Sequence, residues 1–225
     1  MQLDVFTLFP QWFEWFESQR HVRNCIASGS ELRFLDYRET TPLSAGQVDD
    51  SPYGGGAGMV MRVDVIDAAL QAAYGDSRAG RRIVLMTPSG RMFDEELALE
   101  LAAEPQLTLL CGRYEGVDER VREHLCTDAI SIGRYVLAGG ELAAMVVADA
   151  VLRKLPGALG HADSVHEESF SADLDGNPEY PHYTRPPLYR GWGVPDVLLS
   201  GDHERVREWR HERSRERGAQ HDPGA

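Results

Sequence analysis

Short apolar runs alternate along this chain with segments in which apolar residues recur every three or four positions. The runs Ile83–Met86 and Leu107–Cys111 are almost wholly apolar, as expected of strands covered on both faces of a parallel sheet. The segment after Asp94 instead places Leu97 and Leu101 on one helical face, and Asp94 is expected to cap that helix. This alternation predicts an α/β fold with a parallel sheet. The predicted strands are Leu3–Phe9, Glu31–Tyr37, Ile83–Met86, Leu107–Cys111 and Ala129–Ile132, and the predicted helices are Gln11–Gln19, Asp64–Ala73, Asp94–Ala103, Val117–Leu125, Glu141–Leu155 and His203–Arg217.

The amino-acid composition changes at Pro156, after which Gly, Pro, Ser, His and acidic residues dominate as far as Pro187. Such a composition is typical of a linker or mobile lid rather than of a core. A short helix with interleaved charges closes the chain, and Trp209 lies on it. This helix is either a solvated surface helix or one that faces RNA. The predicted organisation is a main domain at 1–158, a flexible linker at 159–177 and a small helical domain at 178–225.

Composition narrows the class of protein. An apolar fraction of 42% in 225 residues is that of an ordinary soluble protein with a full core. A net charge of −13 argues against non-specific nucleic-acid binding but leaves room for a specific RNA partner. Three cysteines without zinc spacing, no secretory leader and no membrane-spanning segment predict a cytoplasmic protein without a structural metal.

Three glycine-bearing bends follow predicted strands and carry the candidate chemistry: Thr87–Gly90, Gly112–Gly116 and Ile132–Gly140. Because the carboxyl ends of parallel strands share one edge of a sheet, these bends are expected to form one pocket. Glycines let main-chain groups approach a ligand there. The aromatic ring of Tyr114 and the carboxylate of Glu115 suit a cofactor with an adenine, a ribose and a charged tail, although each bend alone can be an ordinary turn.

A long loop, Arg38–Met61, contains the glycine-rich segment Pro52–Met59. Its spacing matches neither a dinucleotide-binding fingerprint nor a Walker loop. Either it is a flexible surface loop, or its backbone surrounds a flat ring while Asp49 or Asp50 accepts hydrogen bonds from a base.

The residues alone do not identify a catalytic base. Arg153 and Lys154 end a predicted helix, where cations also complement the helix dipole. The acids of the linker region, among them Asp173, Asp175 and Glu179, are equally compatible with a solvated loop.

Taken in order, several runs resemble the TrmD family of bacterial tRNA (guanine-N1)-methyltransferases, which belongs to the SPOUT class. The resemblance covers nearly the whole chain. The runs are Phe6–Pro10, Val48–Asp50 with Pro52–Met59, Leu110–Gly116, Ser131–Glu141, Leu155–Gly157 with Leu159–Gly160, Pro181–Pro186 and Val197–Gly201.

The resemblance implies methylation of N1 of the guanosine immediately 3′ of the anticodon, with S-adenosylmethionine as the methyl donor. It also implies a deep trefoil knot around the cofactor, a homodimer in which the partner's C-terminal domain closes over each site, and assistance by Mg²⁺ at an unknown position. The cofactor-binding residues it implies are Thr87, Pro88, Gly112, Tyr114, Glu115, Ile132, Gly133, Arg134, Tyr135, Val136, Leu137, Gly139 and Gly140.

The same resemblance assigns the catalytic roles. Glu179 occupies the position of the family's general base, normally an aspartate, and Arg153 that of its catalytic arginine. Because the linker is longer than usual, Asp175 or Asp173 can replace Glu179. Arg134 stands where the family usually has aspartate. The resemblance also implies that the C-terminal domain at 178–225 binds tRNA. The implied tRNA-binding residues are Asp50, Tyr53, Gly54, Gly55 and Arg185.

Two other functions fit parts of the sequence. A SPOUT enzyme acting on ribosomal RNA would share the cofactor bends but need not carry Pro52–Met59 or Pro181–Pro186, so their presence disfavours it. A catalytically impaired, S-adenosylmethionine-dependent RNA-binding module is suggested only by the departures at Glu179 and Arg134.

Overall fold

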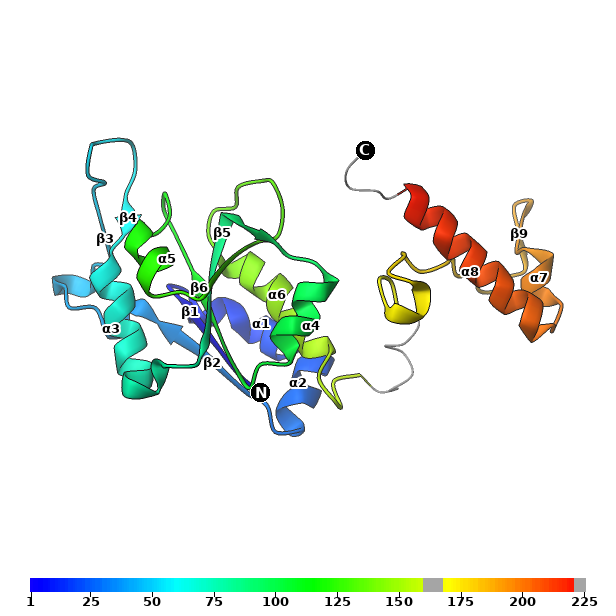
Figure 1. The fold of residues 1–225 in the computed structure, drawn as a ribbon, viewed down its shortest axis with the longest axis horizontal. Coiled ribbons are helices and arrows are strands. Elements are labelled where there is room, and N and C mark those ends of the chain that lie inside the picture. The colour runs from blue at the N-terminus through cyan, green and yellow to red at the C-terminus, as the bar shows by residue number, and fades with distance from the viewer. Residues whose placement is uncertain (160–167, 221–225) are drawn as a thin grey trace. The chain divides into compact units, whose positions relative to one another are not determined.

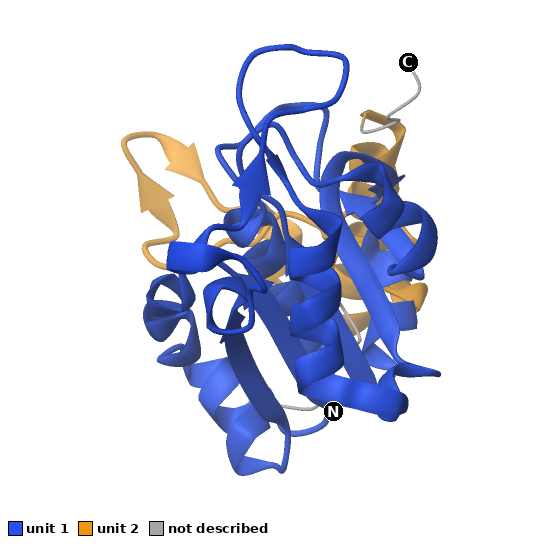
Figure 2. Cartoon of the chain, turned by 90° about the vertical axis from the view of Figure 1, so that its left-hand side faces the viewer, with its two compact units in different colours: residues 1–160 blue, residues 161–225 orange. Residues whose placement is uncertain are grey.

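The computed structural model describes residues 1–159 and 168–220 (Figure 1). The chain divides into two compact units, Met1–Gly160 and His161–Ala225 (Figure 2). The predicted boundaries at 158 and 177 stay predictions, and residues 160–167 of the predicted linker lie outside the described residues.

A five-stranded parallel sheet forms the centre of the first unit, with the strand order β2-β1-β6-β5-β7 (Figure 1). Phe6 of β1 and Leu85 of β5 both pair with Leu110 of the central β6. The predicted α/β fold with a parallel sheet is therefore confirmed. The strands are β1 (Gln2–Thr7), β2 (Glu31–Asp36), β5 (Arg82–Met92), β6 (Gln106–Cys111) and β7 (Asp128–Ser131).

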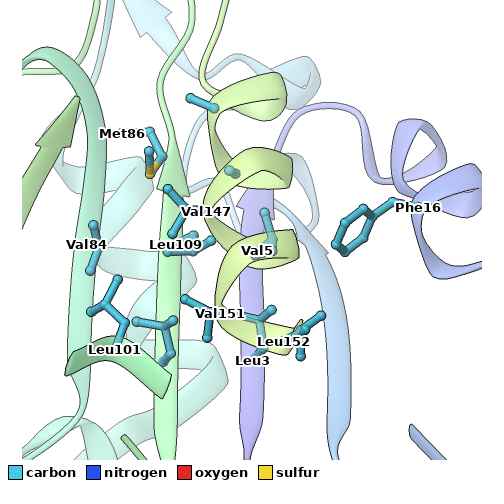
Figure 3. Packing of buried hydrophobic residues seen from close by; sticks show 14 of the residues in the cluster. Leu3, Val5, Phe16, Val84, Met86, Leu101, Leu109, Val147, Val151 and Leu152 are labelled. Carbon is cyan, nitrogen blue, oxygen red and sulfur yellow. The ribbon is translucent and has the colours of Figure 1, made fainter. Parts of the chain in front are cut away.

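Helices cover both faces of this sheet, so each face has its own core. On β5, Val84 and Met86 belong to one buried cluster, whereas Ile83 and Leu85 belong to the other. Figure 3 shows the first cluster, where side chains of α6 such as Val147 lie over the strands. Helices α1 (Glu14–Glu17), α2 (Arg20–Ala27), α4 (Glu95–Ala102) and α6 (Glu141–Arg153) contribute to the first cluster, and α3 (Val63–Tyr74) and α5 (Glu119–His124) to the second.

Two predicted elements of the first unit differ from the structure. Pro10–Phe13 is a 3₁₀ turn that leads into α1, and the extended backbone of Gln19 ends the predicted helix 11–19 as a separate helix, α2, begins at Arg20. Sequence reasoning missed α2 because this polar segment buries only Val22 and Cys25. Strand β5 also continues past its predicted end, since its residues Arg91 and Met92 still pair with β7.

Other local predictions are confirmed. The Asp94 side chain caps α4 by accepting a hydrogen bond from the Leu97 N–H at 2.8 Å. The predicted long loop contains only a two-residue pairing between β3 (Asp49–Asp50) and β4 (Val60–Met61) and two 3₁₀ turns, Tyr37–Glu39 and Ser44–Gly46. A further 3₁₀ turn, Gly75–Arg78, follows α3.

The described part of the second unit is organised around one long helix. Ser214 of this helix donates to the Pro178 carbonyl and Arg217 to the Glu179 carbonyl, so the segment before the Pro181–Pro186 run is attached to it. The elements are a 3₁₀ turn (Ala172–Leu174), the hairpin strands β8 (Leu188–Tyr189) and β9 (Trp192–Gly193), α7 (Asp196–Leu199) and α8 (His203–Gln220). Within residues 1–159 and 168–220, no helix is both long and apolar enough to cross a membrane.

A buried carboxylate joins three elements of the first unit. Asp4 of β1 is fully buried and accepts two hydrogen bonds from Arg33, both at 2.7 Å. Arg81 contacts the same carboxylate at 3.1 Å and Tyr74 donates to it at 2.7 Å. Because Arg81 is itself buried, its charge depends on Asp4 for compensation.

We therefore expect Asp4→Asn to lower the free energy of unfolding by about 3 kcal/mol, because two guanidinium groups lose their counter-charge. Urea unfolding measures this change. Asp67→Asn is the matched control, since Asp67 forms an exposed pair with Arg78 and its loss is expected to cost less than about 1 kcal/mol. Equal stabilities of the two variants would contradict this account of the network.

Candidate functional site

A cavity of about 360 Å³ lies at the carboxyl edge of the sheet, beyond β5, β6 and β7. Its walls come from the three glycine-bearing bends that the sequence singled out. All the predicted cofactor-binding residues except Arg134, which is exposed in the same bend, line this cavity. The lining residues that were not among the predicted cofactor-binding residues are Leu85, Met86, Ser89, Arg113, Gly116, Val117, Glu119, Arg122, Ile130, Ser131 and Ala143.

Main-chain contacts hold two of the bends together. The Gly140 N–H donates to the Gly112 carbonyl at 2.9 Å, and the main chains of Arg113 and Gly139 form an isolated antiparallel β-bridge. A Cβ atom on Gly140 would lie 2.8 Å from Cys111 Cα, closer than such atoms approach. Glycine is therefore required where the chain leaves the bend and enters α6.

An ion pair beneath the bends joins Arg113, which lies in the predicted bend Gly112–Gly116, to Glu141, which the sequence analysis did not assign to the site. Glu141 is the first residue of α6 and its side chain is almost fully buried. Its carboxylate lies 3.0 Å from Arg113 Nε and accepts a hydrogen bond from Thr7 Oγ1 at 2.9 Å. The Arg113 guanidinium also donates to the Ala138 carbonyl and lies over the rings of Phe9 and Trp12. Both residues lie in runs that carry the family resemblance, Leu110–Gly116 and Ser131–Glu141, but nothing in the sequence indicated that they pair.

The glycine-rich loop lies against the same edge. The Glu115 N–H donates to the Met59 carbonyl at 3.0 Å, and the Glu115 side chain occupies the space where a Cβ of Gly58 would be. Tyr114 adopts a left-handed backbone conformation with φ of 60°. Burial, together with the nearby negative charge of Asp49, raises the pKa of the Tyr114 hydroxyl. Tyr114 therefore stays a neutral donor beside an acidic loop.

The predicted tRNA-binding residues fall in both units. Tyr53 is completely exposed at the tip of the loop, and Gly54 and Gly55 both have positive φ. Asp50 pairs with Arg62 at 3.3 Å at the base of the loop. Arg185 is exposed in the second unit.

The two predicted catalytic residues lie in different units, and neither lines the cavity. Arg153 ends α6, whose first residue lies below the bends. At 1.5 Å per residue, the helix places Arg153 about 18 Å along its axis from Glu141. Glu179 forms an ion pair with His182 at 2.8 Å, and its N–H donates to Ser169. The cavity of one chain's first unit is thus formed without either residue.

The structure narrows the chemistry of the cavity. Burial raises the pKa of the Cys111 thiol well above its usual value, which removes it as a nucleophile. Within residues 1–159 and 168–220, no three His, Cys, Asp or Glu side chains gather closely enough to hold a metal ion. The cavity is lined by glycines, the rings of Tyr114 and Tyr135 and the carboxylates of Glu115 and Glu119, a set that suits a polar organic ligand.

A parallel sheet with a glycine-lined cavity at the ends of three strands places the chain among the α/β proteins that bind a ligand at the carboxyl edge of the sheet. The sequence model of the family described as tRNA (Guanine-1)-methyltransferase TrmD matches residues 1–224. The chain belongs to this TrmD family.

Curated relatives support the same assignment. A protein of Dehalococcoides mccartyi strain CBDB1 named tRNA (guanine-N(1)-)-methyltransferase is 48% identical over 95% of this chain and 86% of its own length. Proteins with the same name from Brevibacillus brevis and Bacillus cereus strain AH820 are each 49% identical. The match covers 93% of this chain and 85% of the relative for the first, and 95% and 87% for the second.

The close approach of Gly140 to the main chain of Cys111 predicts how a single methyl group at position 140 changes stability. We expect Gly140→Ala to lower the free energy of unfolding by about 1–3 kcal/mol, because the main chain of Cys111 cannot move away without disturbing β6. Gly112→Ala is the control, since its Cβ would meet only a Val117 methyl group at 3.2 Å. Urea unfolding compares the two variants. A Gly140→Ala protein as stable as Gly112→Ala would contradict the proposed close approach.

Proposed function

We propose that this chain transfers a methyl group from S-adenosylmethionine to N1 of the guanosine immediately 3′ of the anticodon in tRNA. Family membership along almost the whole chain carries the proposal, because the relatives at 48–49% identity are named tRNA (guanine-N(1)-)-methyltransferase. The cavity at the strand ends supports it with a site for the donor.

The cavity fits the chemistry of S-adenosylmethionine. Its volume of about 360 Å³ is in the range of small-ligand sites. Glycines at 112, 139 and 140 expose main-chain groups, Tyr114 offers an aromatic wall, and Glu115 offers an acceptor for amino or hydroxyl groups. When bound, the donor supplies a methyl group on a positively charged sulfur.

The chain's own residues would act on the guanine. In neutral guanine N1 carries a proton, so a base has to remove it before the methyl group is accepted. We assign this role to Glu179, whose main chain is fixed on both sides: its N–H donates to Ser169 and its carbonyl accepts from Arg217. Arg153 would stabilise the negative charge that develops on O6.

A homodimer would complete this site. The first unit exposes large apolar side chains on two segments, Trp12 and Trp15 near α1 and Leu142 and Val146 on α6. These segments meet at Arg113, which contacts both Trp12 and Glu141. Large exposed apolar side chains of this kind favour pairing of two chains. Arg153 and Glu179 of a partner chain would then reach the cavity of the first.

We also propose the finer features that belong to the SPOUT class. Two close main-chain approaches support a knotted crossing at the cavity: a Cβ on Gly90 would lie 2.4 Å from Ile130 N, and one on Gly140 would lie 2.8 Å from Cys111 Cα. Mg²⁺ would act with the tRNA rather than in a carboxylate cage. We also propose a cytoplasmic location, which is consistent with three free cysteines and with a tRNA substrate.

The proposed activity predicts methyl transfer from labelled S-adenosylmethionine to an unmodified tRNA transcript with guanosine 3′ of the anticodon. A transcript with adenosine at that position should accept no label. Mapping of the product should place the methyl group on N1. Cofactor binding without incorporation would instead support the impaired RNA-binding module.

The same assay assigns the base. Glu179→Gln should slow single-turnover transfer about 100-fold and leave cofactor affinity unchanged. Matched amide variants at Asp173, Asp175 and Glu168 should stay close to the wild type. Glu168 is included because the neighbouring Ser169 binds the Glu179 N–H. Normal turnover by Glu179→Gln, with a loss at one of the other three, would move the role to that acid.

Mixed dimers test whether two chains share each site. Ile132→Arg should block the cavity, and Arg153→Ala should remove the cation, so each variant alone should be inactive. Mixing and re-forming dimers should restore activity, because half of the sites in a mixed dimer would combine an intact cavity with an intact Arg153. No recovery in verified mixed dimers would show that each site comes from one chain.

A further inference from the structure

The hairpin β8–β9 of the second unit exposes two aromatic rings side by side. Tyr189 and Trp192 pair directly across the hairpin, so their side chains share one face. Their ring centroids are 5.9 Å apart, and the residues are 51% and 70% exposed. Leu188 lies opposite Gly193 in the neighbouring pair. A hairpin with two residues in each strand cannot bury such rings in a core of its own. Their exposure therefore indicates a surface that binds a partner.

The turn between these rings adds a cation in an unfavourable conformation. Arg190 and Gly191 both have positive φ, 51° and 86°, as a tight two-residue turn of type I′ requires. Asn or Gly normally occupies the first position, whereas arginine is disfavoured there. The Arg190 guanidinium lies 5.3 Å from the centre of the Tyr189 ring. A disfavoured residue kept at a surface turn points to a use for its side chain.

The segment between Glu179 and Asp196, which contains the hairpin, is positively charged, whereas the whole chain is negatively charged. No acidic residue occurs between Glu179 and Asp196, and Arg185 and Arg190 both lie there, in a chain with a net charge of −13. A basic, aromatic surface on an acidic protein suits an anionic partner with flat groups. Unpaired nucleotides meet both requirements, since their bases stack on aromatic rings and their phosphates pair with arginine.

We infer that the face formed by Tyr189, Arg190 and Trp192 binds unpaired nucleotides of the tRNA substrate, with a base stacked on the rings and a phosphate paired with Arg190. Only the naming of the RNA as tRNA rests on the proposed function. A second copy of this chain is the other conceivable occupant. It is disfavoured because the hairpin carries the cation Arg190 at its turn, whereas the surface proposed for chain pairing is on the first unit.

Equilibrium binding of an unmodified tRNA transcript to the full chain tests this inference, together with the KM for tRNA and kcat. Trp192→Ala should raise the tRNA Kd and KM about 10-fold, whereas Trp192→Phe should keep most of the affinity. Arg190→Gly places a residue that this turn favours at position 190, so the hairpin should keep its conformation. The variant should bind tRNA about 3- to 10-fold more weakly, and the salt dependence of its tRNA affinity should fall by the equivalent of about one phosphate contact. The cofactor Kd and kcat at saturating tRNA should stay within about twofold.

Leu188→Ala is the matched control on the same hairpin and should bind tRNA as the wild type does. Wild-type tRNA affinity in both Trp192→Ala and Arg190→Gly would overturn the inference. So would a loss of dimers in sedimentation of Trp192→Ala, because it would assign the rings to a second chain. Failure of the proposed function looks different: the wild-type chain would not methylate tRNA, while the binding comparison would still decide the hairpin's role.

Discussion

The ion pair between Arg113 and Glu141 is the contact on which the cavity depends. It joins the end of β6 to the start of α6, while Thr7 ties the same carboxylate to the end of β1. Arg113 then reaches the Ala138 carbonyl and so holds the last bend. A buried pair of this kind is costly to break, because either partner alone would remain charged without compensation. The position of Glu141 in the first turn of α6 adds the favourable helix dipole.

This constraint is also the reason why we propose that two chains share each site. The pair fixes the first residue of α6 below the cavity, and the helix then carries Arg153 away along its whole length. A straight helix packed on the sheet through Val147 and Val151 cannot fold back (Figure 3). In the proposed dimer, one chain would supply the pocket for the methyl donor, and its partner would supply the residues that act on the guanine. The aromatic hairpin would contribute to holding the RNA in place.

Much of the fold followed from the sequence, because strands buried on both faces, such as Leu107–Cys111, have an unmistakable apolar pattern. The bends were also found, since glycines after strands leave a local signal. Helix α2 was missed because its buried face is only Val22 and Cys25. The pair Arg113–Glu141 could not be predicted, because its partners lie far apart in sequence and meet only through the order of the strands. The remoteness of Arg153 from the cavity likewise depends on how α6 is seated.

Calorimetric titration of S-adenosylmethionine into the wild-type chain and into Glu141→Gln tests the central claim, that the bends held by this pair form the donor site. The wild type should bind one molecule per chain. Glu141→Gln should bind at least about 10-fold more weakly, because the bends lose their shared anchor, while its circular dichroism shows a folded protein. Equal affinities of the two folded proteins would contradict the claim that this pair holds the donor site.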